Sequence, residues 1–146
     1  HRPAQTVVHR DFQSRNLMLR GGRRDGGLAI IDFQDALIGP YVYDLVALLR
    51  DSYVVLERPF ISRMLQQYRQ LMPEAPAMLE ADFDLCTVQR KLKDAGRFVF
   101  IKEVKGNPDF MRFFQPSLRY GLEALSRLGG FNDLLDLASR SLEVRA

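Results

Sequence analysis

A glycine-rich segment near the start of the chain most constrains how this sequence can fold. Residues 21–27 read Gly-Gly-Arg-Arg-Asp-Gly-Gly and separate two short apolar runs, residues 16–20 and 28–33. The Asp-Gly and Gly-Gly pairs can adopt the positive φ angles that a tight hairpin connection needs. The sequence therefore predicts a small β-hairpin. Because two strands alone are marginal in water, this hairpin must pack on other elements.

The rest of the chain has mainly helical periodicity. A β-branched run at residues 6–8 predicts one more extended segment, but from Gly39 onward apolar residues recur at helical spacing between proline and glycine breaks. We expect a fold of the α+β class, mainly α, with helices over residues 40–56, 59–71, 82–105, 116–128 and 132–142. In the longest of these, the predicted apolar stripe consists of Leu85, Val88, Leu92, Ala95 and Val99.

Composition excludes several classes of protein. The chain has 146 residues, 47% of them hydrophobic, which is enough for one folded domain with its own core. Its single cysteine, Cys86, cannot form an internal disulfide, so we expect a cytoplasmic protein. Cys86 lies on an apolar helix face, so we expect it in the core. The net charge of +3 is spread along the chain, which disfavours nucleic acid as a partner. No apolar run is long enough to predict a membrane span.

Polar residues interrupt the apolar pattern at two places. The segment His9-Arg10-Asp11-Phe12-Gln13-Ser14-Arg15-Asn16 lies between apolar runs, and Asp32 ends an apolar strand that we expect to be largely buried. A buried carboxylate is costly unless it is paired or binds a metal. In an alternative interpretation, Asp11 forms a turn, Asn16 caps a helix and Asp32 interacts with a helix dipole.

These segments carry a resemblance to a known family. His9-Arg10-Asp11 with Asn16 resembles the catalytic loop of protein-kinase-like phosphotransferases, and Ile31-Asp32-Phe33 resembles their metal-binding strand end. The fold this implies is a protein-kinase-like C-terminal lobe, in which a small hairpin bears the catalytic and metal residues and packs on a helical bundle.

The continuation narrows the resemblance to one branch. Asp32-Phe33-Gln34-Asp35-Ala36, Gly39-Pro40 and Tyr43-Asp44-Leu45 look like the aminoglycoside phosphotransferase and choline kinase branch, with Gln34 where protein kinases have glycine. Within it, the chain is most similar to bacterial kinases that phosphorylate the anomeric hydroxyl of N-acetylmuramate or N-acetylglucosamine in cell-wall recycling. The resemblance implies ATP and Mg²⁺ as cofactors and a small-molecule substrate.

The resemblance also implies roles for individual residues. Asp11 is the expected base that orients the attacking hydroxyl, and Asn16 with Asp32 would hold Mg²⁺ through the hard oxygen ligands that this ion prefers. Four neighbours have supporting roles or roles left open between support and substrate binding. We expect His9 to hydrogen-bond the loop to the strand that follows Asp32, and Arg10 to form a local salt bridge. Asp35 could contact substrate or a second cation, or form a turn, and Asp44 is expected to start a helix and brace the catalytic loop.

Other readings stay open at this point. All four lysines follow the catalytic loop, so residues 1–146 are expected to be a C-terminal lobe that lacks its N-terminal nucleotide lobe and is inactive alone. The acceptor could be an amino sugar, an aminoglycoside or a choline-like molecule. The chain could also be a non-catalytic kinase-like binding module or an unrelated helical interaction domain. The aromatic cluster at residues 98–114 is expected to be core rather than a substrate-binding wall.

Overall fold

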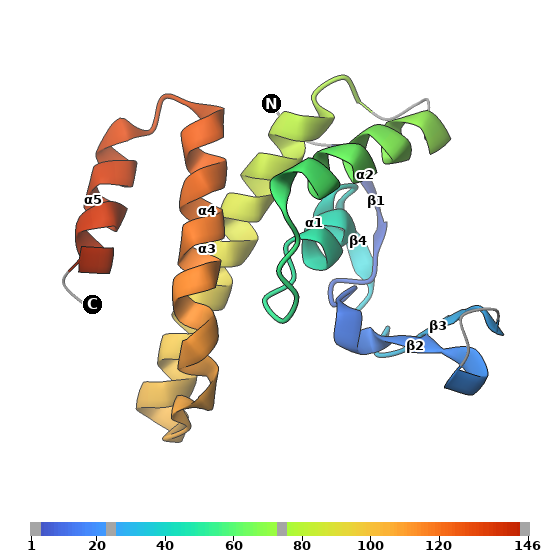
Figure 1. Ribbon diagram of the computed structural model, residues 1–146, viewed down its shortest axis with the longest axis horizontal. Coiled ribbons are helices and arrows are strands. Elements are labelled where there is room, and N and C mark those ends of the chain that lie inside the picture. Colours follow the sequence, from blue (N-terminus) through green and yellow to red (C-terminus); the bar gives the residue numbers. More distant parts are fainter. Residues whose placement is uncertain (1–3, 23–25, 73–75, 144–146) are drawn as a thin grey trace. The chain divides into compact units, whose positions relative to one another are not determined.

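In the computed structural model, which describes residues 4–22, 26–72 and 76–143, helices account for most of the chain (Figure 1). The chain divides into two compact units, residues 1–83 and 84–146, with the boundary inside helix α3 (Leu79–Lys105). The described strands are short and all belong to the first unit. The architecture is therefore α+β and mainly α, as predicted.

The predicted hairpin is present. Strands β2 (Leu17–Leu19) and β3 (Leu28–Ile30) pair in antiparallel register, and Gly21 and Gly22 have φ angles of 62° and 68° at the turn. The Asp-Gly pair falls on residues 25–26, of which residue 25 lies outside the described residues. The ladder continues past β3, where the Ile31 N–H donates to the Asn16 carbonyl at 3.1 Å. This extra bond brings the residues after Ile31 next to Asn16.

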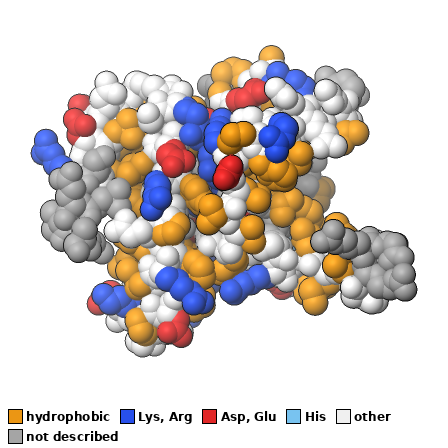
Figure 2. Space-filling model, viewed as in Figure 1, with side chains coloured by type: hydrophobic (Ala, Val, Ile, Leu, Met, Phe, Trp, Pro, Cys, Tyr) orange, Lys and Arg blue, Asp and Glu red, His pale blue; other side chains and the backbone are white. Residues whose placement is uncertain are grey.

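The expectation that the strand before Asp32 is largely buried is wrong. Leu28, Ile30 and Ile31 are 60%, 48% and 44% exposed. In Figure 1 the hairpin extends away from helices α1 (Tyr43–Leu49) and α2 (Arg58–Leu71), and Figure 2 shows hydrophobic side chains at its surface. A two-stranded ribbon has no second layer of its own to cover its faces. The apolar run identified the strand correctly but not its burial.

A second strand pair replaces part of an expected helix. Strand β1 (Gln5–Val8), predicted as extended, pairs antiparallel with β4 (Leu37–Pro40), a segment whose end we expected to begin a helix. Gly39 makes this pairing possible, because a Cβ there would lie 2.8 Å from Val8 Cγ2. The helix expected over residues 40–56 is shorter at both ends and is limited to α1.

The four later helices confirm the sequence predictions to within a few residues. Helix α2 begins beside Pro59, α3 ends before Gly106, and Gly129 and Gly130 follow the end of α4 (Phe114–Leu128), before α5 (Asn132–Glu143). Prolines and glycines set these limits because they suit the first turn and the residues past the last turn. None of the helices within residues 4–22, 26–72 and 76–143 has the length and apolar character needed to cross a bilayer.

The predicted apolar stripe of α3 is displaced. Leu85 and Leu92 are 43% and 37% exposed, whereas Lys91, expected on a polar face, is 1% exposed and its Nζ lies 3.2 Å from Asp94 Oδ2. A long lysine stem packs like an apolar chain when its ammonium group has a partner. The buried row of the helix runs through Phe83, Thr87, Lys91, Ala95 and Phe98.

The aromatic cluster of the second unit is mainly a packing element. The Phe98 ring centroid lies 6.3 Å from that of Phe110 and 5.9 Å from that of Phe113, and Phe98 is buried. Phe100 is instead about half exposed. Cys86 is buried, as predicted. These contacts confirm core packing for Phe98, against which the half-buried Phe110 and Phe113 rings pack.

Candidate active site

Three predicted site residues converge in the first unit. The Asn16 Nδ2 group donates to the Asp11 main-chain carbonyl at 2.9 Å and to Asp11 Oδ2 at 3.1 Å, and it lies 3.4 Å from Asp32 Oδ2. Asn16 is buried, whereas Asp11 is half-buried and Asp32 is exposed. A single amide group therefore stands between the two carboxylates.

Local topology explains this convergence. Asn16 ends a 3-10 turn (Ser14–Asn16) that leads directly into β2, and Asp32 follows Ile31, the residue that bonds to the Asn16 carbonyl. The two residues are therefore neighbours across the open end of the hairpin. The hairpin predicted from the glycine-rich segment is what brings the two predicted metal ligands together.

Two residues of the site have unusual backbone conformations. Among the described residues, Arg10 and Asp32 are the non-glycine positions with positive φ, at 73° and 69°. This region costs an L-residue roughly 1–2 kcal/mol, so surrounding contacts must hold it. One of the two strained residues precedes Asp11 and the other is Asp32 itself.

Asp44 supplies such contacts to the loop before Asp11. It lies in the first turn of α1, as predicted, and its Oδ2 and Oδ1 atoms accept the N–H groups of His9 and Arg10 at 2.7 and 3.0 Å. A carboxylate is favoured there by the helix dipole as well as by the two donors. Asp44 therefore joins α1 to the strained main chain next to Asp11.

His9 joins the loop to the hairpin. Its Nε2 lies 3.0 Å from the Ile31 carbonyl, so Nε2 carries the proton in this contact, and its ring meets Phe12 edge-on at 5.9 Å. Its buried Nδ1 has no hydrogen-bond partner within the described part of the chain. The prediction that His9 bonds to the strand following Asp32 is wrong in detail, because the accepting carbonyl precedes Asp32.

The Arg10 side chain contacts the main chain of Asp35. Arg10 Nη1 donates to the Asp35 carbonyl at 3.4 Å, and the pairing of β1 with β4, in which Val8 opposes Leu37, brings the two segments together. The Asp35 side chain is exposed. The role of this carboxylate stays open between contact with substrate or a second cation and turn formation.

Sequence reasoning missed two glutamines that contact the site carboxylates. The tripeptide Asp-Phe-Gln occurs at residues 11–13 and again at residues 32–34. Gln13 Nε2 donates to Asp11 Oδ2 at 3.2 Å, and Gln34 Nε2 donates to Asp32 Oδ1 at 2.8 Å. The repeated tripeptide was the available signal, because each glutamine follows its aspartate by two residues.

The donor set fits a hard divalent cation. Asp32 offers carboxylate oxygens, and the Asn16 Oδ1 atom accepts no hydrogen bond from the described residues because the amide nitrogen makes all the side-chain contacts. Oxygen ligands from one carboxylate and one amide, completed by water and phosphate, suit Mg²⁺. The described residues contain no cluster of three or more His, Cys, Asp or Glu side chains that would indicate a different metal site.

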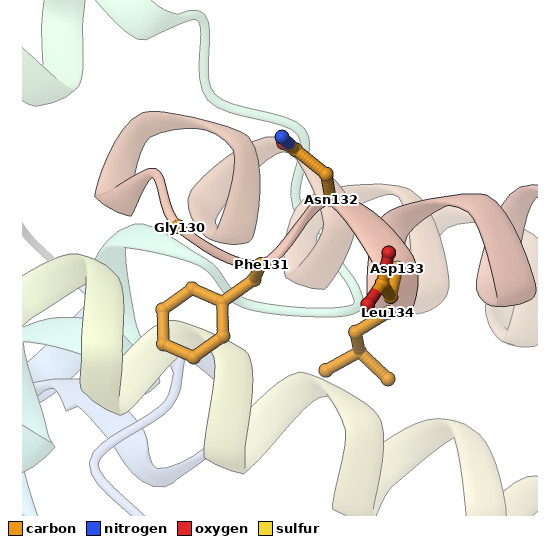
Figure 3. Close-up of a pocket in the computed structure, with 5 residues that line it drawn as sticks. All are labelled: Gly130, Phe131, Asn132, Asp133 and Leu134. Atoms are coloured by element: carbon orange, nitrogen blue, oxygen red, sulfur yellow. The ribbon is translucent and has the colours of Figure 1, made fainter.

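A separate pocket lies in the second unit, at the turn between α4 and α5 (Figure 3). Gly130, Phe131, Asn132, Asp133 and Leu134 line it, and none of the predicted site residues does. In the figure, Phe131 and Leu134 extend to one side of the chain and Asn132 to the other. The pocket contains no grouping of acid, base and nucleophile, so it does not compete with the Asp11 cluster as a catalytic centre.

Curated proteins similar to this chain are sugar kinases by name. An N-acetylmuramate/N-acetylglucosamine kinase of Neisseria meningitidis is 44% identical over 101 residues, covering 64% of this chain and 29% of the relative. Kinases of the same name from Pseudomonas aeruginosa and Pseudomonas putida are 35% and 34% identical, covering 84% and 75% of this chain and 37% and 34% of each relative. The chain thus spans about a third of the length of these relatives.

The match to a family model covers the first unit. The model described as the phosphotransferase enzyme family aligns with residues 1–80, a range that includes Asp11, Asn16, Asp32 and Asp44. It covers more than half of the chain, and the relatives of similar sequence are named kinases. The chain belongs to the phosphotransferase enzyme family, whose fold is kinase-like.

Proposed function

We propose that residues 1–146 form the C-terminal, catalytic lobe of an ATP- and Mg²⁺-dependent kinase that phosphorylates a hydroxyl group of a small molecule, preferably the anomeric hydroxyl of an amino sugar. Asp11 is the proposed base, and Asn16 and Asp32 are the proposed Mg²⁺ ligands. The observation that carries the proposal is the Asn16 amide, which lies within hydrogen-bonding distance of both carboxylates. The names of the relatives, at 34–44% identity, support the amino-sugar acceptor.

In this mechanism the protein mainly positions groups, as phosphoryl transfer requires. Gln13 and Asn16 both donate to Asp11 Oδ2, which restrains the rotation of the carboxylate. Asp11 aligns the acceptor hydroxyl with the γ-phosphorus and takes its proton as the new P–O bond forms and the bond to ADP breaks. Bound Mg²⁺ would neutralise charge on the phosphates. The contacts of Asp44 and His9 hold the loop that carries Asp11.

The proposal includes a second lobe. The relatives are more than twice as long as this chain, and all four lysines of the chain lie after the proposed catalytic loop. We therefore propose that a preceding N-terminal lobe of the same protein binds most of the nucleotide, and that residues 1–146 alone have almost no activity. ATP as the phosphate donor and a single free cysteine both favour the cytoplasm.

The test is an acceptor screen with the full-length protein. ADP release from MgATP is followed with N-acetylmuramate, N-acetylglucosamine, an aminoglycoside and choline, and the product is examined by NMR for a phosphate on the anomeric oxygen. We expect turnover with the two amino sugars. Selective turnover of the aminoglycoside or choline would replace the proposed substrate class, and no ADP release with any acceptor would overturn the kinase assignment.

A further inference from the structure

Asp51 is a buried carboxylate to which the sequence assigns no role. It lies just after α1, is 3% exposed, and uses both of its oxygens. Oδ2 accepts from the Ser14 N–H at 2.8 Å and from Ser14 Oγ at 2.6 Å, and Oδ1 accepts from the Tyr53 N–H at 2.9 Å. One carboxylate therefore joins two segments that are 37 residues apart.

The contact with Ser14 satisfies the start of the turn that carries Asn16. The first N–H groups of a helical turn have no partner within the turn, and a capping side chain usually accepts one of them. Gln13, at the capping position of the Ser14–Asn16 turn, makes no such hydrogen bond. Asp51 provides the acceptor instead, from a distant part of the chain. Its charge strengthens the contact, because hydrogen bonds to ionised groups are shorter and stronger.

A second contact holds the same turn. The Arg15 guanidinium carbon lies 3.6 Å from the centroid of the Tyr53 ring, a stacking distance for a cation on an aromatic face. The Tyr53 main chain is in turn held by Asp51. The segment from Asp51 to Tyr53 therefore contacts residues 14 and 15, which directly precede Asn16, and holds them in place.

From these contacts we infer that Asp51 is a positioning residue that fixes the Asn16 amide for Mg²⁺ binding. The inference rests on the proposed function. Asp44 holds the main chain on one side of Asp11, and Asp51 holds the turn on the other side. Loss of Asp51 leaves Asp11 in the chain but frees the turn that presents Asn16, so the metal requirement is the quantity that changes most.

The test compares Asp51→Asn and Asp51→Ala with the wild type in the full-length protein. We expect the Mg²⁺ concentration for half-maximal activity to rise about 10- to 100-fold, as is typical when a group supporting a metal ligand is removed. The KM for the acceptor should change little at saturating Mg²⁺. Binding of Mn²⁺ in the presence of ADP, measured by electron paramagnetic resonance, should weaken by a similar factor without any turnover.

A matched control uses another buried aspartate. Asp84, in the second unit, is also buried, and both of its carboxylate oxygens accept from Arg127. Asp84→Asn should lower thermal stability and leave Mn²⁺ affinity unchanged. If the Asp51 variants fold and bind Mn²⁺ like the wild type, the inference is wrong. If the wild type releases no ADP with any acceptor, the proposed function fails instead.

If Asp51→Ala does not fold, Ser14→Ala and Tyr53→Phe provide the test. Ser14→Ala removes one of the hydrogen bonds to Asp51 and should weaken Mn²⁺ binding severalfold, whereas Tyr53→Phe keeps the ring under Arg15 and should not. Equal Mn²⁺ affinity for Ser14→Ala and the wild type would then overturn the inference.

Discussion

Asp44 and Asp51 of the first unit and Asp84 of the second unit accept hydrogen bonds from different kinds of group. In the first unit, Asp44 and Asp51 accept main-chain N–H groups and hold irregular segments next to the proposed active site. In the second unit, Asp84 of α3 binds the Arg127 side chain of α4 through two contacts of 2.8 and 2.7 Å. That hydrogen bond raises the pKa of Arg127. The first arrangement shapes a loop, and the second fastens one helix to another.

The difference separates activity from stability. A main-chain N–H is part of the backbone. A carboxylate that accepts a hydrogen bond from it therefore holds the backbone of that residue, and of its neighbours, in position. An ion pair between helices adds stability without setting the geometry of a reacting group. Substitutions in the first unit should therefore change turnover or metal binding most, and substitutions in the second unit should change the free energy of unfolding most.

The largest effect is expected at Asp11. Asp11→Asn keeps the size of the side chain but removes the proposed base, so turnover of the full-length protein should fall by about 10²- to 10⁴-fold. Nucleotide affinity, measured by calorimetry, should stay close to that of the wild type because Asn16 and Asp32 are intact. Near-normal turnover of this variant would show that the first unit does not supply the base.

Phe98 tests the expectation that substitutions in the second unit mainly lower stability. It is 7% exposed and packs against two other rings, so Phe98→Ala should lower the free energy of unfolding by about 3–5 kcal/mol in a urea titration. Phe100→Ala is the control, since Phe100 is 51% exposed and should cost much less. A Phe98 variant that keeps full stability but loses acceptor binding would make the cluster a substrate-binding wall.

Asp44 tests whether effects on turnover and on metal binding can be separated within the first unit. Asp44→Asn loses the charge and one of the two acceptors that hold the His9 and Arg10 N–H groups. Because these donors are half-buried or exposed, the cost of leaving one without a partner should lie below the roughly 1–3 kcal/mol of a fully buried donor. We expect kcat to fall about 10- to 100-fold at saturating Mg²⁺, with a small change in the Mg²⁺ requirement. Asp51 variants should show the reverse pattern. If the Asp44 and Asp51 variants change kcat and the Mg²⁺ requirement to the same extent, the two carboxylates do not position separate parts of the loop, and the loop moves as one rigid segment.

The sequence predicted the parts of the molecule that depend on local chemistry. The glycine-rich turn was sufficient to predict the hairpin, whereas the convergence of Asp11, Asn16 and Asp32 was expected only from the resemblance to kinase-like phosphotransferases. The β1–β4 pairing was missed because it depends on the close approach of Gly39 to Val8, between segments distant in sequence. Asp51 was missed for the same reason, since nothing near it in sequence indicates that Ser14 is its partner.

Periodicity predicted where the later helices lie better than which of their faces are buried. Helix α3 runs through the predicted range, but its buried row includes Lys91 rather than Leu92. A stripe of leucines marks a helix face that can be buried, and a lysine with a nearby carboxylate partner can occupy such a face as well. Burial therefore depends on the packing partners, which hydropathy along one helix does not contain.

The smallest effect is expected at Tyr41 and appears only in alkaline solution. The Tyr41 hydroxyl donates to Asp82 at 3.0 Å, and burial together with this carboxylate raises its pKa well above the ordinary value of 10.0. Between these two pKa values the unfolded chain loses the phenolic proton while the folded chain keeps it. The contribution of Tyr41 to stability is therefore complete below pH 10 and declines as the pH rises through the alkaline range. Tyr41→Phe should make the urea midpoint fall less between pH 9 and pH 11 than it does in the wild type. An equal alkaline loss in Tyr41→Phe and wild type would show that the Tyr41–Asp82 contact does not act as a neutral donor to a carboxylate, and the first unit would then owe its pH response to other groups.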